Sequence, residues 1–192
     1  MAMARWEPNA QQRLQQAAGL LFAERGYADV IVADIAERAG LTKRTFFNHF
    51  PDKREVLFAD AAAFEAHVLK HLAAADPALA PLDAAVEALA GAGLSDLAKY
   101  GEYAATRRDL IASSTELQER DLIKTAALTA AIAAGLLERG APARTAAFAG
   151  KAAVAVFIAA CDDWIDSPAA NLATLIYQEL AELRHAICGA DS

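Results

Sequence analysis

The run Lys43–Phe50, which reads KRTFFNHF, holds the residues best suited to binding chemistry in this chain. It contains two cations and a histidine and no acidic residue. Lysine and arginine bind phosphate oxygens, and the arginine fork matches the hydrogen-bonding edge of guanine. The run therefore favours contact with nucleic acid, although an ordinary solvent-exposed helix carries the same charge pattern.

The surrounding sequence predicts how this run is presented. Residues 32–50 read VADIAERAGLTKRTFFNHF and predict two short helices, Val32–Arg38 and Lys43–His49, joined by a tight turn. Gly40 permits the turn, and the Thr42 hydroxyl can cap the second helix. This is the spacing of a helix-turn-helix, whose second helix enters the major groove of DNA. Any helical hairpin with a glycine turn gives a similar local pattern, so the turn alone does not decide the function.

Other residues with catalytic or metal-binding potential are sparse. His67 and His71 have a spacing that can hold a metal on one helix face, but no third ligand is indicated. Glu182 and His185 form a single Glu-x-x-His, whereas a di-iron bundle needs two such motifs and two further glutamates. Phosphate-loop, dinucleotide-binding, zinc-protease and serine-hydrolase motifs do not occur. The sequence therefore predicts no enzyme, no metal and no cofactor, and a helical enzyme or a binding module without DNA binding stays the alternative.

The whole chain is predicted to be helical apart from its turns and loops. The chain has 192 residues, 56% of them hydrophobic, and proline and glycine divide long alanine- and leucine-rich stretches. No alternating run typical of a strand occurs. We expect an all-α fold of about nine helices. Besides the two short helices, the expected ones cover about 9–24, 52–75, 82–89, 94–112, 113–139, 143–165 and 167–187.

Charge is distributed unevenly along the chain. Residues 1–60 carry eight basic and eight acidic side chains, so residues 61–192 hold the entire net charge of −7. This asymmetry indicates two parts with different tasks. The two cysteines have no paired spacing, the N-terminal residues have no apolar core of the kind found in signal peptides, and no apolar run reaches transmembrane length. These features predict a protein of the reducing cytoplasm.

The N-terminal segment closely resembles the DNA-binding domain of tetracycline-repressor-like (TetR family) transcriptional regulators. The residues that carry the resemblance are GY at 26–27, VADIA at 32–36 and AGLTKRTFFNHFPDKREVL at 39–57. The resemblance implies a helix-turn-helix domain over residues 1–59. It also implies a helical effector-binding and dimerisation domain over residues 60–192.

By position, the resemblance implies a set of DNA-contacting residues, namely Thr42, Lys43, Arg44, Thr45, Phe47, Asn48, His49 and Lys53. Lys43 and Arg44 are expected to reach base edges, and the others to touch the DNA backbone or its phosphates. Two positions depart from the family pattern. Phe47 lacks the tyrosine hydroxyl often found there, and Ile31 stands where Ser or Thr usually caps the first short helix. Phe46 and Phe50 are expected in the core.

The resemblance further implies a ligand-responsive regulator, usually a repressor, that binds a palindromic operator as a homodimer and is released by a small molecule. The candidates to line an effector cavity between helices are Phe64, His67, His71, Tyr100, Tyr103, Arg107, Phe148 and Trp164. Such a lining suits an apolar or aromatic effector.

The homodimer is expected to form through the last two helices. The first of them offers a surface of small residues, made of Ala152, Ala153, Ala155, Val156, Ala159 and Ala160. The second offers a stripe of larger ones, made of Leu172, Leu175, Ile176, Leu180, Leu183 and Ile187. A helix buried in the core of a monomer has the same pattern, so the pattern alone leaves both open.

Overall fold

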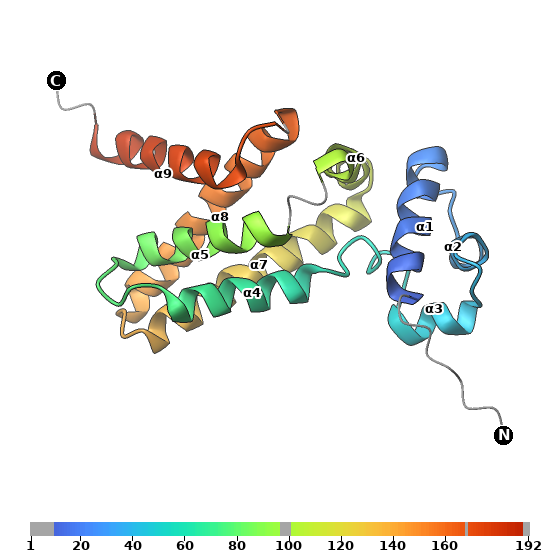
Figure 1. Ribbon diagram of the computed structural model, residues 1–192, viewed down its shortest axis with the longest axis horizontal. Helices are drawn as coiled ribbons and strands as arrows, with labels where there is room; N and C mark the ends of the chain where they lie inside the picture. The colour runs from blue at the N-terminus through green and yellow to red at the C-terminus, as the bar shows by residue number, and fades with distance from the viewer. Residues whose placement is uncertain (1–9, 97–100, 168, 190–192) are drawn as a thin grey trace. The chain divides into compact units, whose positions relative to one another are not determined.

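The computed structural model describes residues 10–96, 101–167 and 169–189. Within these ranges the chain forms nine α-helices and no strand, which confirms the predicted all-α fold (Figure 1). The chain divides into two compact units. One comprises residues 1–60 and 106–121, and the other comprises residues 61–105 and 122–192.

The first unit is built on three N-terminal helices, α1 (Ala10–Arg25), α2 (Val32–Arg38) and α3 (Lys43–His49). In Figure 1 they are the blue to cyan helices, and each contacts the other two. The apolar stripe of α1 is buried, as the 3.6-residue period of its apolar positions predicts. Gly26 ends α1 with a φ of 79°, a conformation that glycine adopts without strain.

The segment between α3 and α4 corrects the prediction of one helix from Asp52 to about Ala75. Residues 51–60 form turns, and α4 spans Ala61–Ala74. The Asp52 carboxylate does accept from the backbone N–H of Arg54 at 2.9 Å, as a helix cap would. However, both Val56 and Phe58 are buried in the first unit. Residues two apart point to different sides of a helix, so a helix here could not bury both side chains.

The second unit is organised around α5, which packs against α4, α8 and α9. Its elements are α4, α5 (Pro81–Asp96), most of α7 (Thr115–Glu138), α8 (Ala143–Asp166), α9 (Leu172–Cys188) and the start of α6 (Gly101–Ala112). The buried core is rich in alanine and valine, with larger side chains such as Leu89, Ile132 and Ile176 fully buried. Small side chains let the helices approach closely.

Gly91 and Gly93 do not interrupt a helix, contrary to the sequence prediction, because α5 runs through both. Each glycine instead makes room for a neighbour. A Cβ on Gly91 would lie 2.8 Å from Nδ1 of His71 on α4. A Cβ on Gly93 would lie 3.2 Å from Cδ2 of Leu172 on α9. Close packing of α5 is therefore what these glycines provide, at the cost of some helix propensity.

The start of α9 also differs from the prediction of a helix opened by Ser167 and Pro168. Ser167 ends α8, and Pro168 lies outside the described residues. The helix begins at Leu172, and the Asn171 side chain accepts from the Thr174 N–H at 3.2 Å. Asparagine is a good N-cap, so a second capping signal four residues downstream decides the boundary.

The apolar stripe of α9 faces the core of the second unit. Leu172, Ile176 and Leu180 are buried there, together with Ala153 and Ala160 of α8. By length and composition α8 is apolar enough to cross a membrane. It carries nine buried residues and packs on α5 and α9, which is the arrangement of a core helix. Much of the expected dimer surface is therefore used inside one chain.

Candidate nucleic-acid interface

Helix α3 presents polar and cationic side chains on its outer face. Lys43 and Arg44 are exposed at its start, directly after the exposed cap Thr42. Phe47 and Asn48 are exposed one turn further along, and Phe47 has 55% of its surface accessible. Thr45 and His49 are half-buried between this face and the core. Seven of the eight expected DNA-contacting residues therefore lie on or beside one face of α3.

Buried aromatic residues and a capping threonine hold α3 in place. Phe46 is completely buried and its ring centroid lies 5.5 Å from that of Phe50, so both belong to the core as predicted. The Thr42 hydroxyl accepts from the Thr45 N–H at 3.1 Å, which confirms the predicted cap. The two threonine hydroxyls are also 2.9 Å apart, within hydrogen-bond distance.

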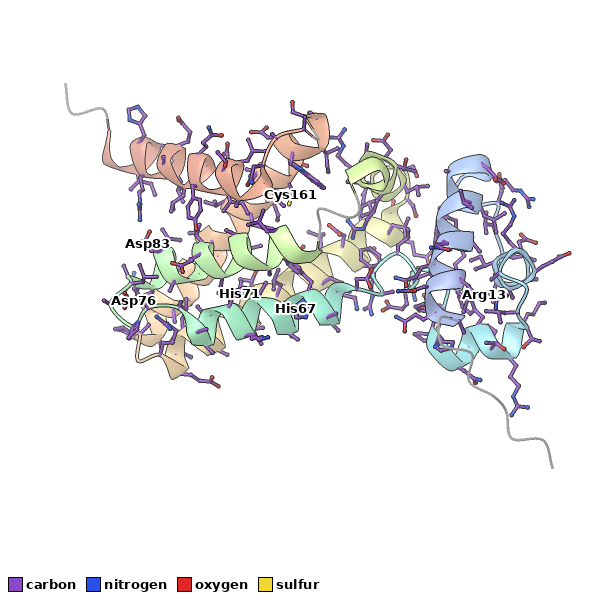
Figure 2. All side chains as sticks on the ribbon, viewed as in Figure 1. Arg13, His67, His71, Asp76, Asp83 and Cys161 are labelled. Carbon is purple, nitrogen blue, oxygen red and sulfur yellow. The ribbon has the colours of Figure 1, made fainter. Side chains whose placement is uncertain are left out.

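The turn between α2 and α3 is fixed to α1. Gly40 has a φ of 64°, so the turn needs glycine there. Arg13 of α1 donates from Nη2 to the carbonyl of Ala39 at 2.6 Å (Figure 2). On the other side, Arg38 of α2 makes a two-bond ion pair with Glu24 of α1. These contacts hold the helix-turn-helix as one rigid piece.

The start of α2 shows how Ile31 substitutes for a capping residue. The Ile31 side chain is 58% exposed and offers no acceptor. The Asp34 carboxylate instead accepts from the Ile31 N–H at 3.1 Å, which is the returning half of a capping box. The remaining N–H groups of the first turn are left without a side-chain cap.

Lys53 is expected from the resemblance to touch a phosphate, and in the structure its ammonium makes hydrogen bonds within the chain. Its ammonium donates to the carbonyls of Tyr27 at 2.8 Å and Val30 at 2.9 Å, with the Ala28 carbonyl at 3.4 Å. It also lies 4.2 Å from the centroid of the Tyr27 ring. An ammonium has three donors, and these three carbonyls can accept from all of them. Lys53 thus ties the loop before α2 to the segment after α3.

Residues 106–121 complete the core of the first unit, which sequence reasoning missed. Leu110 and the fully buried Leu117 pack among the apolar residues of α1 to α3. Arg107 lies 5.1 Å from the centroid of the Phe58 ring. No local pattern signals these contacts, because they join residues about fifty positions or more apart in the chain.

Ion pairs also join residues 106–121 to the segment after α3. Arg120 pairs with Glu55, and Arg54 pairs with both Asp52 at 2.6 Å and Glu116 at 3.2 Å. The hydrogen bond from Arg54 lowers the pKa of the Asp52 carboxyl below its usual value. These side chains are partly exposed, so each pair adds little stability, but together they specify where the 106–121 segment sits.

Tyr27 places a polar group in the core of the first unit. Its side chain is buried at 5% exposure, and its hydroxyl has no hydrogen-bond partner among the described residues. Burial, with the nearby Glu116 carboxylate, raises the pKa of the phenol well above its usual range. A buried donor without an acceptor costs stability.

Among the described residues, the candidate effector-lining side chains do not line one common hollow. Phe64 stacks on Phe157 in the core of the second unit, with ring centroids 5.4 Å apart. His67 and His71 are both exposed on α4 (Figure 2). Phe148 is 61% exposed on α8.

Of the other four candidates, the structure describes the side chains of two, Arg107 and Trp164. Arg107 belongs to the first unit and pairs there with Asp121 at 3.3 Å. Trp164 is buried in the second unit. Tyr100 lies outside the described residues, and so does the Tyr103 side chain. Among described residues, no group of three or more His, Cys, Asp or Glu is placed to hold a metal ion.

Two hollows formed by described residues open on the second unit. One has a volume of about 450 Å³ between α5 and α9, and across it Arg184 pairs with Asp83 at 2.5 Å. The other has a volume of about 290 Å³ beside Trp164, where α5 and α8 end and α9 begins. Of the effector candidates, Trp164 lines the second hollow and none lines the first.

Comparison with known proteins agrees with this geometry. Residues 15–59 match the family model of bacterial regulatory proteins of the tetR family. Among curated proteins, no sequence matches the chain.

Several solved structures share the fold. The fatty acid degradation regulator FadR from Bacillus halodurans is 18% identical, with a TM-score of 0.57, over 88% of this chain and 94% of that one. The SmeT–triclosan complex, SmeT being a repressor from Stenotrophomonas maltophilia, is 18% identical, with a TM-score of 0.56, over 90% of each chain. A transcriptional regulator from Rhodococcus sp. Rha1 is 23% identical, with a TM-score of 0.51, over 90% of this chain and 94% of that one. The helix-turn-helix at residues 32–49 thus lies inside the segment that matches the tetR family of bacterial regulatory proteins, and the all-α fold of the chain is similar to that of these solved structures.

Proposed function

We propose that this chain is a transcriptional regulator of the tetR family, a repressor that binds a palindromic operator as a homodimer and leaves it when a small molecule binds. The observation that carries the proposal is the outer face of α3, where Lys43 and Arg44 stand exposed on a helix that Phe46 anchors in the core. A rigid helix with a cationic, acid-free face is what reading the major groove requires.

Within this proposal some residues of α3 contact the base edges and others contact the DNA backbone. Lys43 and Arg44 read base edges, since their long side chains are exposed at the start of the helix. Thr42, Thr45 and His49 hold the phosphate backbone. Phe47 and Asn48 touch the backbone from the next turn, Phe47 by packing alone because it has no hydroxyl. Lys53 stabilises the position of α3 indirectly, because its ammonium donates to carbonyls of the loop before α2.

Binding to the DNA that flanks its own coding region tests the proposal directly. Fluorescence anisotropy across a salt series should show tight binding to one duplex and weak binding to a scrambled duplex of equal composition. The affinity for both should fall steeply with salt, because each neutralised phosphate contributes a slope of about −0.9. Refolded protein serves as the control for a ligand carried through purification. Equal affinity for both duplexes in the native and refolded samples would contradict operator recognition.

The homodimer is proposed to form through the outward faces of α8 and α9. Ala155 and Ile158 of α8 and Tyr177 of α9 are exposed there, while the inward faces are used in the core. Two-fold symmetry also suits an operator with two half-sites. An Ile158→Glu variant should change the mass measured by light scattering from dimer to monomer. Leu137→Glu on α7, where the leucine is 47% exposed against 44% for Ile158, is the matched control and should stay dimeric.

The proposed effector is apolar or aromatic, and the protein acts in the cytoplasm. SmeT, which shares the fold, is seen in complex with triclosan, and this supports a small-molecule ligand for the second unit here. An effector releases DNA only if it binds the DNA-free conformation more tightly than the DNA-bound one. The ratio of its affinities for the two conformations limits how far it can lower the affinity for DNA.

A further inference from the structure

The outer face of α3 carries one large apolar side chain among polar and cationic ones. Phe47 has 55% of its surface accessible, whereas Phe46, the residue before it, is completely buried. Residues three and four positions apart are neighbours on a helix surface, so Phe47 lies beside both Lys43 and Arg44, which are also exposed. An aromatic ring therefore occupies the middle of the face that carries the proposed DNA contacts.

The ring of Phe47 is supported by the core. Its centroid lies 5.5 Å from that of Phe46, and the two ring planes meet at 83°. This edge-to-face arrangement is favourable for an aromatic pair, and Phe46 is itself fixed by its burial. A supported ring has little rotational freedom left to lose, so it can add apolar contact on binding at a low cost in entropy.

The major groove offers one apolar group on its base edges to such a ring. The bases present hydrogen-bond donors and acceptors there, and thymine adds its C5 methyl, with which phenylalanine makes apolar contact. The phenyl ring has no hydrogen-bonding group, so it cannot bind a phosphate or a polar base edge in this way. The methyl points toward the backbone of its own strand, so a ring that packs on that backbone can cover the methyl as well.

We propose that Phe47 determines a preference for thymine, because its ring covers the C5 methyl of one thymine in each half-site. This inference rests on the function proposed above and adds a base preference to it. The rise of α3 restricts where that thymine lies. Three residues of an α-helix rise about 4.5 Å and stacked base pairs are about 3.4 Å apart, so the thymine is about one or two base pairs from the pair that Arg44 reads.

Deoxyuridine tests the contact, because it differs from thymidine only in lacking the C5 methyl. The full chain first selects an operator from a pool of random duplexes. Each thymine of one half-site is then replaced in turn by deoxyuridine, and the affinity is measured by fluorescence anisotropy. One replacement should weaken binding about fourfold, which is the contribution of one buried methyl. Its position should lie within about two base pairs of the one at which Arg44→Ala loses its preference.

A Phe47→Ala variant should bind the thymine and deoxyuridine operators with equal affinity, because it lacks the ring that contacts the methyl. Leu20→Ala is the matched control, since Leu20 is 56% exposed on α1, and this variant should keep the fourfold difference. Thermal unfolding should show that both variants stay folded, because both replaced side chains are more than half exposed.

5-Methylcytosine supplies the same methyl on a different base. At the sensitive position the parent protein should bind 5-methylcytosine about fourfold more tightly than cytosine, and Phe47→Ala should bind both equally. This comparison separates the methyl from the hydrogen-bonding edge of thymine, which cytosine lacks.

Two results would overturn the proposal while operator binding stands. In the first, no deoxyuridine replacement weakens binding by the parent protein. In the second, Phe47→Ala weakens binding to both operators and keeps their fourfold difference, which would restrict the ring to the sugar–phosphate backbone. If no duplex is enriched from the pool, the function proposed above fails, and the thymine contact fails with it.

Discussion

Replacing Lys53 by methionine separates two roles that the same ammonium could have. In the structure its donors reach the carbonyls of Tyr27 at 2.8 Å and Val30 at 2.9 Å. A hydrogen bond from a charged donor contributes about 1.5–3 kcal/mol, and these carbonyls are only partly buried, so we expect a loss of about 2 kcal/mol. For a chain of this size that corresponds to a fall in Tm of roughly 4–8 °C. Methionine keeps the length of the stem, so the loss comes from the ammonium.

The assay combines thermal unfolding with DNA binding over a salt series on one random duplex. If Lys53 is a structural tie, Lys53→Met lowers Tm and leaves the slope of log K against log salt unchanged. If it binds a phosphate, the slope becomes shallower by about 0.9. Lys70→Met, at an exposed lysine of the second unit, is the matched control and should change neither quantity. A shallower slope for Lys53→Met with an unchanged Tm would refute the tie.

Three further perturbations probe the same unit. Arg44→Ala should weaken operator binding by about 1–3 kcal/mol and relax the preference at one base pair, as measured by anisotropy on operators mutated singly. Leu117→Ala removes a fully buried side chain and should lower the free energy of unfolding by about 2–5 kcal/mol. Hydrogen exchange should show that the backbone amides of α1 to α3 lose protection. Unchanged protection there would mean that residues 106–121 are not part of this core. Tyr27→Phe removes a buried hydroxyl without a partner and should leave Tm equal or higher. Because the phenol pKa is raised in the folded state, the parent protein should lose stability as pH rises above about 10, and the phenylalanine variant should lose less.

The sequence predicted the helix-turn-helix of α2 and α3 in detail because the residues that determine it are close together in the chain. The bounds of α2 and α3 follow from Gly40, Thr42 and Pro51, all within a few residues of the helix ends they control. The burial of Phe46 and the exposure of Arg44 follow from helical periodicity. The boundaries of α4 and α9 were wrong where a local capping signal competed with packing or with a second cap.

The effector residues could not be placed in this way. Aromatic and histidine side chains on apolar helices are equally suited to the core, the surface or a cavity, and the choice depends on which helix lies opposite. His71, for example, lies against α5 because Gly91 leaves space for its ring. Only the packed second unit reveals that Trp164 borders a hollow while Phe64 lies in the core.

Turns, caps and periodicity act over a few residues, so the all-α fold and the helix-turn-helix with its cationic outer face could be predicted without the structure. The tertiary structure alone decided that residues 106–121 complete the first unit, that Lys53 bonds to the loop before α2, and that the stripe of α9 faces inward. The physical reason is separation along the chain. These contacts join residues more than twenty positions apart, and their formation depends on how whole helices pack rather than on any pattern within one of them.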